Sequence, residues 1–418
     1  MTPELITITL DKLTYGGDAL GRIDRRAVFI PFSLPGETVR ARVVAEKRGH
    51  LRATLVEVLE PSPMRIVPKC KYFGACGGCH YQHLAYEAQL QAKAEILSDQ
   101  LTRIGKIEKP PMLPIIPSPQ AWNYRNHVQF HFSEKGCLGY IAAEGSSVLP
   151  VDECHLPEPP LNALWPKLDL SPELDLERVS LRLGNDEEIL LILESTEPPE
   201  MDLEADISVV HLAGNDTVVM AGEPSISITV EAGGSPSAQR TFHISANSFF
   251  QVNTPMAGKM VAHLLKMLPV SAETTLLDVY CGAGLFAAFF APRVGRVIGI
   301  EASPSACEDF AINLDDFNNV DLYEAPAEAV LPHLDIHPEI ILVDPPRAGL
   351  DKKVVDSILA MDPDQIAYIS CDPATLGRDA ARLIAGGYRL LEVTPFDLFP
   401  QTYHIESISL FAKVSADH

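Results

Sequence analysis

Three short apolar runs in the C-terminal part of the chain each end in residues that could do chemistry. The first leads into Tyr280-Cys281-Gly282-Ala283-Gly284, the second into Asp344-Pro345-Pro346-Arg347, and the third into Ser370-Cys371-Asp372-Pro373. In an open α/β sheet, ligands bind beyond the carboxyl ends of the strands, so these residues should meet at one edge. A cysteine there can act as a nucleophile. The sequence therefore predicts an enzyme that uses Cys371.

The first run also carries a cofactor signal. Gly282 and Gly284 have no Cβ, so the backbone can approach a nucleotide-like ligand closely. Glu301 ends the next predicted strand, where its carboxylate could bind a ribose diol. Ala287 replaces the third glycine of a dinucleotide site, which favours S-adenosylmethionine instead. Gly-x-Gly alone would equally suit a tight turn after a core strand.

A cysteine cluster lies nearer the N-terminus. Cys70, Cys76 and Cys79 follow the spacing C-x5-C-x2-C and are interleaved with glycines, which suits convergence on a soft ion or cluster. Cys154 is the best candidate for a fourth ligand, and Cys137 is the alternative. Thiolate ligation suits zinc or an iron–sulfur cluster equally. The spacing differs from the C-x3-C-x2-C of radical S-adenosylmethionine enzymes.

Composition limits the class of protein. A chain of 418 residues should hold two or three domains. No apolar run approaches the ~18 residues of a membrane span, and the N-terminus lacks a signal-peptide pattern. We therefore expect a cytoplasmic protein without a membrane partner, acting as a monomer. In that reducing compartment the eight cysteines should not form disulfides.

Charge is unevenly distributed although the net charge is -23. Residues 1–135 carry 18 Lys and Arg against 13 Asp and Glu, whereas residues 136–240 carry 4 against 20. This asymmetry predicts a basic contact face for RNA at the N-terminal end and a solvated, acidic middle. The basic residues expected to contact phosphates are Arg22, Arg25, Arg26, Lys47, Arg48 and Arg52.

The elements that must position these residues fall into three parts. Residues 1–60 alternate short β-like runs with Gly-rich turns at Gly16-Gly17 and Gly21, which predicts a small RNA-binding barrel. Residues 61–245 begin with a Pro-Ser-Pro linker and the cysteines, continue with a helix over 84–104, and form a β-rich central domain; the helix should pack on the catalytic domain. Residues 246–418 alternate strands and helices, as in a Rossmann-like α/β domain, and the resemblance given below implies that this is the methyltransferase domain. The predicted fold class is multidomain α/β plus β.

With these residues assembled, the chain resembles the RNA uracil-5 methyltransferases, which make 5-methyluridine in tRNA and ribosomal RNA. The likeness covers nearly the whole length: the N-terminal barrel is similar to an OB-like TRAM domain, and five motifs follow in the family's order. These are Phe250-Gln251-Val252-Asn253, Asp278 to Gly284, Asp344 to Arg347, Ser370 to Pro373 and Tyr403-His404-Ile405-Glu406. Leu285 and Pro326 depart from the pattern, which bears on cofactor affinity.

The resemblance implies a role for each residue. Cys371 would add to carbon 6 of uracil and Glu406 would remove the proton from carbon 5, although by position alone Glu406 would more often be an exposed strand carboxylate. Asp344 and Gln251 would bind the base. The S-adenosylmethionine residues would be Gln251, Tyr280, Gly282, Gly284, Glu301 and Asp344, and the [4Fe-4S] ligands would be Cys70, Cys76, Cys79 and Cys154.

Two other classes of protein share some of these features. An amino-group methyltransferase would also use Asp-Pro-Pro, but with an aromatic residue where Arg347 stands. A non-catalytic RNA-binding or RNA-folding protein would need neither Cys371 nor Glu406. Among RNA targets, we expect 23S rRNA first and the T-loop uridine of tRNA as the alternative.

Overall fold

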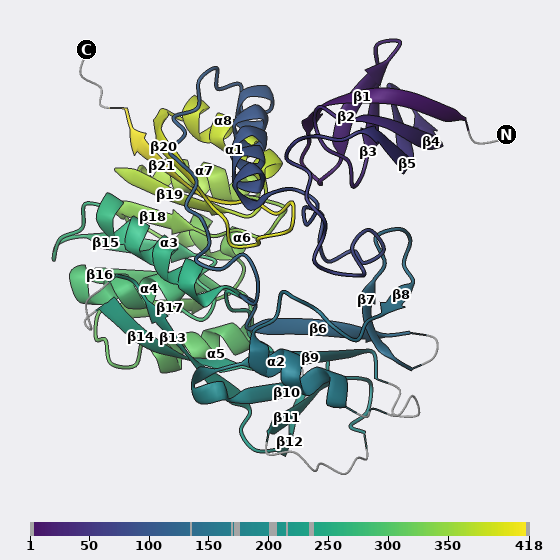
Figure 1. Cartoon of the computed structure of the whole chain (residues 1–418). Helices are drawn as coiled ribbons and strands as arrows, with labels where there is room; N and C mark the ends of the chain where they lie inside the picture. The colour runs from purple at the N-terminus through teal and green to yellow at the C-terminus, as the bar shows by residue number, and fades with distance from the viewer. Residues whose placement is uncertain are drawn as a thin grey trace.

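A computed structural model describes residues 4–133, 136–168, 170, 176–199, 207–214, 216–233 and 238–414. It has three parts: an N-terminal barrel, a central sheet and a C-terminal α/β unit (Figure 1). The predicted fold class is confirmed. No helix among the described residues is long and apolar enough to cross a membrane.

The N-terminal part is a closed five-stranded barrel in the order β1-β2-β3-β5-β4. Its interior is filled by alternate side chains such as Ile8, Val28 and Val39, which are buried. Gly21 does not form the predicted turn: it lies inside a strand that the sequence analysis missed, and a Cβ there would come 2.7 Å from the Thr9 carbonyl oxygen. The strands are β1 Leu5–Leu13, β2 Ala19–Ile23, β3 Arg26–Ile30, β4 Thr38–Lys47 and β5 His50–Glu60.

The predicted linker after the barrel is fastened to it. Ser62 is buried and its N–H donates to the Glu37 carboxylate at 3.3 Å, while Arg65 forms an ion pair with the same carboxylate. The cysteine loop follows, and then the long helix α1 Tyr86–Arg103.

The central part is a seven-stranded sheet in the order β12-β11-β10-β9-β6-β7-β8, covered by the short helix α2 Pro159–Leu164. Its apolar core includes Phe130, Trp165 and Leu181. No apolar run in the sequence predicted strands β7, β8 and β12, which are short or exposed. The strands are β6 His127–Phe132, β7 Leu138–Ile141, β8 Val148–Pro150, β9 Arg178–Leu183, β10 Ile189–Glu194, β11 Ser208–Ala213 and β12 Asp216–Ala221.

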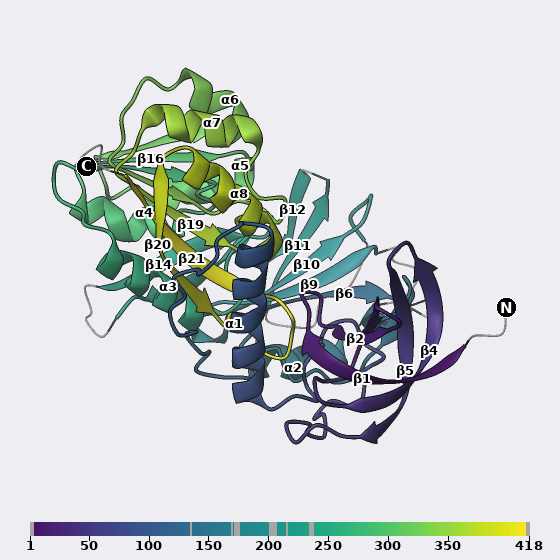
Figure 2. The ribbon, with the colours of Figure 1, turned by 90° about the horizontal axis from the view of Figure 1, so that it is seen from above.

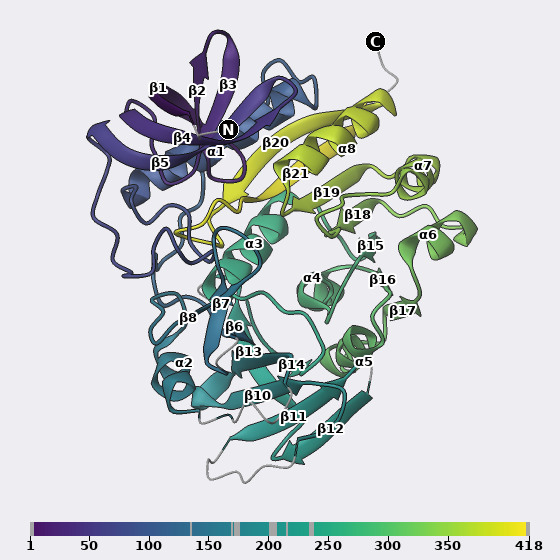
Figure 3. The same cartoon turned by 90° about the vertical axis from the view of Figure 1, so that its right-hand side faces the viewer.

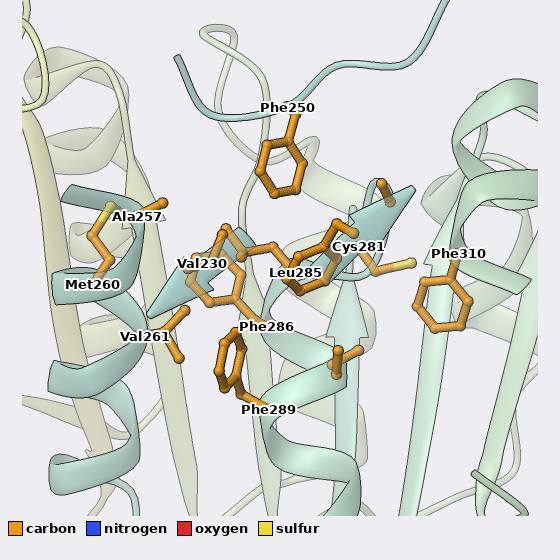
Figure 4. Packing of buried hydrophobic residues seen from close by; sticks show 14 of the residues in the cluster. Val230, Phe250, Ala257, Met260, Val261, Cys281, Leu285, Phe286, Phe289 and Phe310 are labelled. Atoms are coloured by element: carbon orange, nitrogen blue, oxygen red, sulfur yellow. The ribbon is translucent and has the colours of Figure 1, made fainter. Parts of the chain in front are cut away.

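A separate hairpin, β13 Ser225–Glu231 and β14 Gln239–Ser245, packs on the catalytic part. Val230 lies in one apolar cluster with Phe250, Val261 and Phe286 (Figure 4). The proposed boundary at residue 245 therefore separates this hairpin from the helices with which it shares a core.

The C-terminal part is a seven-stranded sheet in the order β17-β16-β15-β18-β19-β21-β20, with β21 antiparallel to both neighbours. The order reverses on either side of β15, which creates the crevice where such sheets bind ligands. Its strands are β15 Thr275–Val279, β16 Arg296–Glu301, β17 Val320–Glu324, β18 Ile340–Val343, β19 Gln365–Ser370, β20 Tyr388–Phe396 and β21 Glu406–Lys413. Its helices are α3 Thr254–Met267, α4 Leu285–Phe290, α5 Pro304–Asn313, α6 Ala327–Val330, α7 Lys352–Met361 and α8 Pro373–Ala385.

Helix α1 joins the barrel to the catalytic sheet. It stands between the barrel and strands β20 and β21 (Figure 2). It crosses α8 closely, because a Cβ on Gly377 would come 3.2 Å from the Gln100 carbonyl oxygen. At the other side of the molecule, α5 lies beside β14 (Figure 3).

Candidate active site

The loop after β15 has the geometry of a ligand cradle. Tyr280, Gly282 and Gly284 all have positive φ angles, of 66°, 53° and 87°. Only glycine suits the last position, because a Cβ on Gly284 would come 2.4 Å from the Leu314 side chain. A positive φ at an aromatic residue such as Tyr280 is a strained conformation of the kind that clusters at functional sites.

Glu301 at the end of β16 fixes this loop. Its carboxylate accepts hydrogen bonds from the backbone N–H groups of Gly282 at 2.9 Å, and of Ala302 and Ser303 at 2.8 Å each. These bonds fix Glu301, the residue predicted to bind the ribose, against the glycine loop.

A buried pair of carboxyl groups lies next to the cradle. Asp278, in β15, is fully buried, and neither of its carboxyl oxygens has a hydrogen-bond partner among the described residues. Burial and the Asp344 charge raise the pKa of Asp278 to about 8, and burial raises the pKa of Asp344 to about 7. An unpartnered buried carboxyl group is costly unless a cation or a donor arrives. No separate role was predicted for Asp278, although an acidic residue inside an apolar run is a pattern that indicates a functional site.

Cys371 lies where β19 meets α8. Asp372 caps that helix, since its carboxylate accepts from the N–H groups of Ala374 and Thr375 at 2.9 Å. Burial, followed by the charges of Glu406 and Asp344, raises the pKa of the Cys371 thiol to about 12. These surroundings favour the protonated thiol even more strongly than in an ordinary cysteine.

Glu406 begins β21 and is buried. Burial and the Asp344 charge raise its pKa well above the ordinary value, whereas Arg347 and Lys93 act in the opposite direction. Glu406 is thus not the exposed strand carboxylate that its position alone would suggest. The Cys371 thiol feels the charges of Glu406 and Asp344, Glu406 feels the charge of Asp344, and Arg347 is the counter-charge to Cys371 and Glu406.

Aromatic side chains gather on the loop before Glu406, residues 397–405. The Tyr403 ring lies 4.4 Å from the His404 ring and 4.5 Å from His80 of the cysteine loop. Tyr15 of the barrel meets Tyr403 edge-on and donates from its hydroxyl to Asp372 at 2.9 Å. The barrel therefore touches the residue next to Cys371, which no sequence motif indicated.

The remaining predicted cofactor position and the two departures lie around this site. The backbone carbonyl of Gln251 accepts from Asn126 at 3.1 Å, and Asn253 nearby donates to the Leu398 carbonyl at 3.0 Å. Among the described residues, no hydrogen bond links the Gln251 side chain to Cys371. Leu285 is buried in the core at the start of α4, and Pro326 precedes α6.

The four predicted cluster cysteines line one cavity of about 190 Å³. Cys70, Cys76 and Cys79 come from the loop before α1, and Cys154 follows β8. Burial raises the pKa of the Cys79 thiol to about 12. Cys137 is exposed and does not line this cavity. Within the described residues, no three His, Cys, Asp or Glu side chains converge tightly enough to hold a single metal ion.

The predicted phosphate contacts lie on the barrel, and part of their charge is neutralised there. Arg26 pairs with Glu46 at 2.7 Å and Arg52 with Asp18 at 2.8 Å. The described residues provide no such partner for Arg22, Arg25, Lys47 or Arg48, of which Arg25 and Arg48 lie in the β2–β3 and β4–β5 turns.

Comparison with known proteins agrees with this geometry. Residues 236–414 match the model of the tRNA (uracil-5-)-methyltransferase family, and residues 3–56 match the TRAM domain. An uncharacterized RNA methyltransferase of Aquifex aeolicus is 35% identical over 98% of this chain and 99% of its own length. One of Thermosynechococcus vestitus is 32% identical over 97% of each chain.

A solved structure shares the fold. The tRNA (uracil-54, C5)-methyltransferase of Pyrococcus abyssi, in complex with S-adenosyl-L-homocysteine, superposes with a TM-score of 0.74 at 24% identity and covers 97% of this chain and 100% of its own. From the relatives and the family match, the chain belongs to the RNA methyltransferases, in the family described by the tRNA (uracil-5-)-methyltransferase model.

Proposed function

We propose that this enzyme methylates carbon 5 of a uridine in RNA through a covalent bond between Cys371 and the base. The observation that carries the proposal is the half-buried Cys371 thiol close enough to the buried Glu406 and to Asp344 to feel their charges, with Arg347 as counter-charge to the thiol and Glu406. An amino-group methyltransferase would have no use for this thiol.

The chemistry follows from the groups present. Carbon 5 of uracil is a weak nucleophile, so the Cys371 thiol first gives its proton to water and its sulfur bonds to carbon 6, which makes an enolate. Arg347 favours the thiolate. After methyl transfer, the Glu406 carboxylate removes the proton from carbon 5, the sulfur–carbon bond breaks and the thiolate is released. Asp344 would hold the uracil imide, and the base must leave its stack to enter.

S-Adenosylmethionine would supply the methyl group. Its predicted binding residues are Gln251, Tyr280, Gly282, Gly284, Glu301 and Asp344. Asp278 extends this set, because its unpartnered carboxyl oxygens fit a ligand that carries a sulfonium and an ammonium group.

We propose that the cysteine cavity holds a [4Fe-4S] cluster, because four cysteines line one cavity of about 190 Å³. Zinc held by the same thiolates is the alternative. Cys70, Cys76, Cys79 and Cys154 would each hold one corner of the cluster. Four protein ligands leave no open position, so we assign the cluster a structural role.

For the RNA, we propose 23S rRNA as the first target and the tRNA T-loop as the second. The test is tritium release from each RNA labelled at uracil carbon 5. The wild type should release tritium from one of the two, and Cys371→Ala should release none while still binding S-adenosylmethionine. Methylation with retained tritium would show a different methyl acceptor, and turnover by the variant would remove Cys371 from the mechanism.

A further inference from the structure

A fully buried ion pair lies behind the proposed base. The Lys93 ammonium of α1 donates to the Asp397 carboxylate at 2.6 Å, and both side chains are 0% exposed. Burial lowers the pKa of Lys93, and the Asp397 charge opposes that change. A buried pair of this kind costs desolvation and is weak evidence of a gain in stability. A role other than stabilising the fold is therefore needed to explain the Lys93–Asp397 pair.

The pair belongs to a face of α1 that holds the 397–405 loop. Tyr86, Gln89 and Lys93 are spaced by three and four residues, so they share one side of the helix. The Tyr86 hydroxyl donates to Asp397 at 2.8 Å. Gln89 and Gln401 exchange two hydrogen bonds of 3.0 Å. One helix face thus fixes the first half of the 397–405 loop, from Asp397 to Gln401.

Lys93 also makes a contact with the loop that Tyr86 and Gln89 do not make. Its ammonium donates to the Phe399 carbonyl at 2.9 Å, so two of its three N–H donors have partners among the described residues. Its positive charge is felt at Glu406. The other groups that face Glu406 are Asp344 and Arg347, from the segment after β18, and Cys371, at the end of β19.

We propose that Lys93 is a positioning residue for Glu406: it anchors the 397–405 loop through Asp397 and Phe399, and it supplies an interior positive charge that favours the basic form of Glu406. This inference rests on the proposed function, in which Glu406 releases the methylated RNA from Cys371. Lys93 touches neither RNA nor cofactor in this account.

The measurement is the rate at which the covalent RNA adduct resolves in a single turnover, followed on denaturing gels as a function of pH. Lys93→Met should raise the pH midpoint of that step by about one unit, because the Glu406 carboxylate loses a favourable charge. Asp397→Asn should raise the midpoint by less than Lys93→Met, because a fully buried Lys93 without its counter-ion loses its proton and no longer favours the Glu406 carboxylate. Gln89→Met, which weakens the loop without changing charge, should alter the rate and leave the midpoint in place.

Glu406→Gln distinguishes a failure of the proposed function from a failure of the inference about Lys93. If this variant traps no adduct, the proposed function fails. If it does trap the adduct, yet Lys93→Met leaves the midpoint in place, the inference about Lys93 is overturned. S-adenosylmethionine binding by each variant shows that it is folded, and the double variant, which removes both charges, should return the midpoint toward that of the wild type.

Discussion

At the scale of single residues, Asp278 shows most clearly that the site is built for a cationic ligand. Its carboxyl group is fully buried, has no partner among the described residues and lies beside a second acid, Asp344. Without a ligand this arrangement opposes ionisation, which is why the pKa of Asp278 rises to about 8.

Asp278→Asn should stabilise the free protein and weaken the cofactor. The folded pKa lies above the ordinary 3.8, so the protonated acid stabilises the fold at low pH, and this contribution is lost as pH rises through about 8. The variant cannot ionise, so its melting temperature relative to wild type should increase from pH 5 to pH 9. An unpartnered buried acid costs on the order of 1–3 kcal/mol, and calorimetry should show a comparable loss in S-adenosylmethionine affinity. A pH-independent difference in melting temperature would contradict the assignment.

The reactivity of Cys371 should report its environment directly. Because its pKa is raised to about 12, alkylation by iodoacetamide in the free enzyme should accelerate about tenfold per pH unit from pH 7 to pH 9, without a plateau. Mass spectrometry of the Cys371 peptide measures this rate, with Cys371→Ala as the blank. A plateau below pH 8 would show that Arg347 outweighs burial.

At this scale, the sequence located Cys371 and Asp344 at strand ends but did not show what surrounds them. Cys371 and Asp344 follow apolar strands, which is a readable pattern. The burial of Glu406 depends on β20, α1 and Arg347 meeting in space. No local pattern could have shown that Lys93, more than 300 positions earlier in the chain, lies near it.

At the scale of elements, the cysteine loop and the 397–405 loop support each other. The N–H groups of His80 and Tyr81 both donate to the Gln401 carbonyl at 2.9 Å, and the Tyr124 hydroxyl donates to the Pro400 carbonyl at 3.1 Å. The cysteine loop therefore supports the segment that precedes Glu406.

Cys79→Ser should accordingly lose the cluster and loosen the catalytic loop. Anaerobically purified wild type should be brown, with about four irons and four sulfides per chain, whereas the variant should be pale and have a lower melting temperature. Cys137→Ser is the matched control and should keep its iron, since Cys137 lies outside the cavity. One zinc per wild-type chain and no visible absorbance would exclude the cluster.

The elements were partly predictable. Long periodic segments such as α1 and the buried parallel strands of the catalytic sheet were found within a few residues. Strand β2 was missed because Gly21 reads as a turn, when it is needed for close approach of β1. Strands β7, β8 and β12 were missed because two of them have four residues or fewer and the third is largely exposed.

At the scale of the whole molecule, the barrel is an attached part of the active site. Tyr15 donates to Asp372, and barrel core residues such as Ile8 and Val28 belong to the same apolar cluster as α1 and Val343. Deleting residues 1–60 would expose that cluster, so surface charges give a cleaner test of RNA docking.

Arg25→Ala, Lys47→Ala and Arg48→Ala should each weaken RNA binding and flatten the log–log salt dependence by about 0.7 if the RNA is single-stranded. Arg40→Ala is the control, because its guanidinium already pairs with Glu57 at 2.8 Å. Filter binding over a salt series measures both quantities. Equal effects from all four variants would show that general charge, and not these turns of the barrel, attracts the RNA.

The central claim is a covalent bond between Cys371 and a uracil that has received its methyl group. The most direct measurement is mass spectrometry of peptides from Glu406→Gln incubated with RNA and S-adenosylmethionine. We expect the Cys371 peptide to carry a 5-methylated uridine nucleotide, and the double variant with Cys371→Ala to carry none. Methylated RNA formed without any adduct on Cys371 would contradict the account.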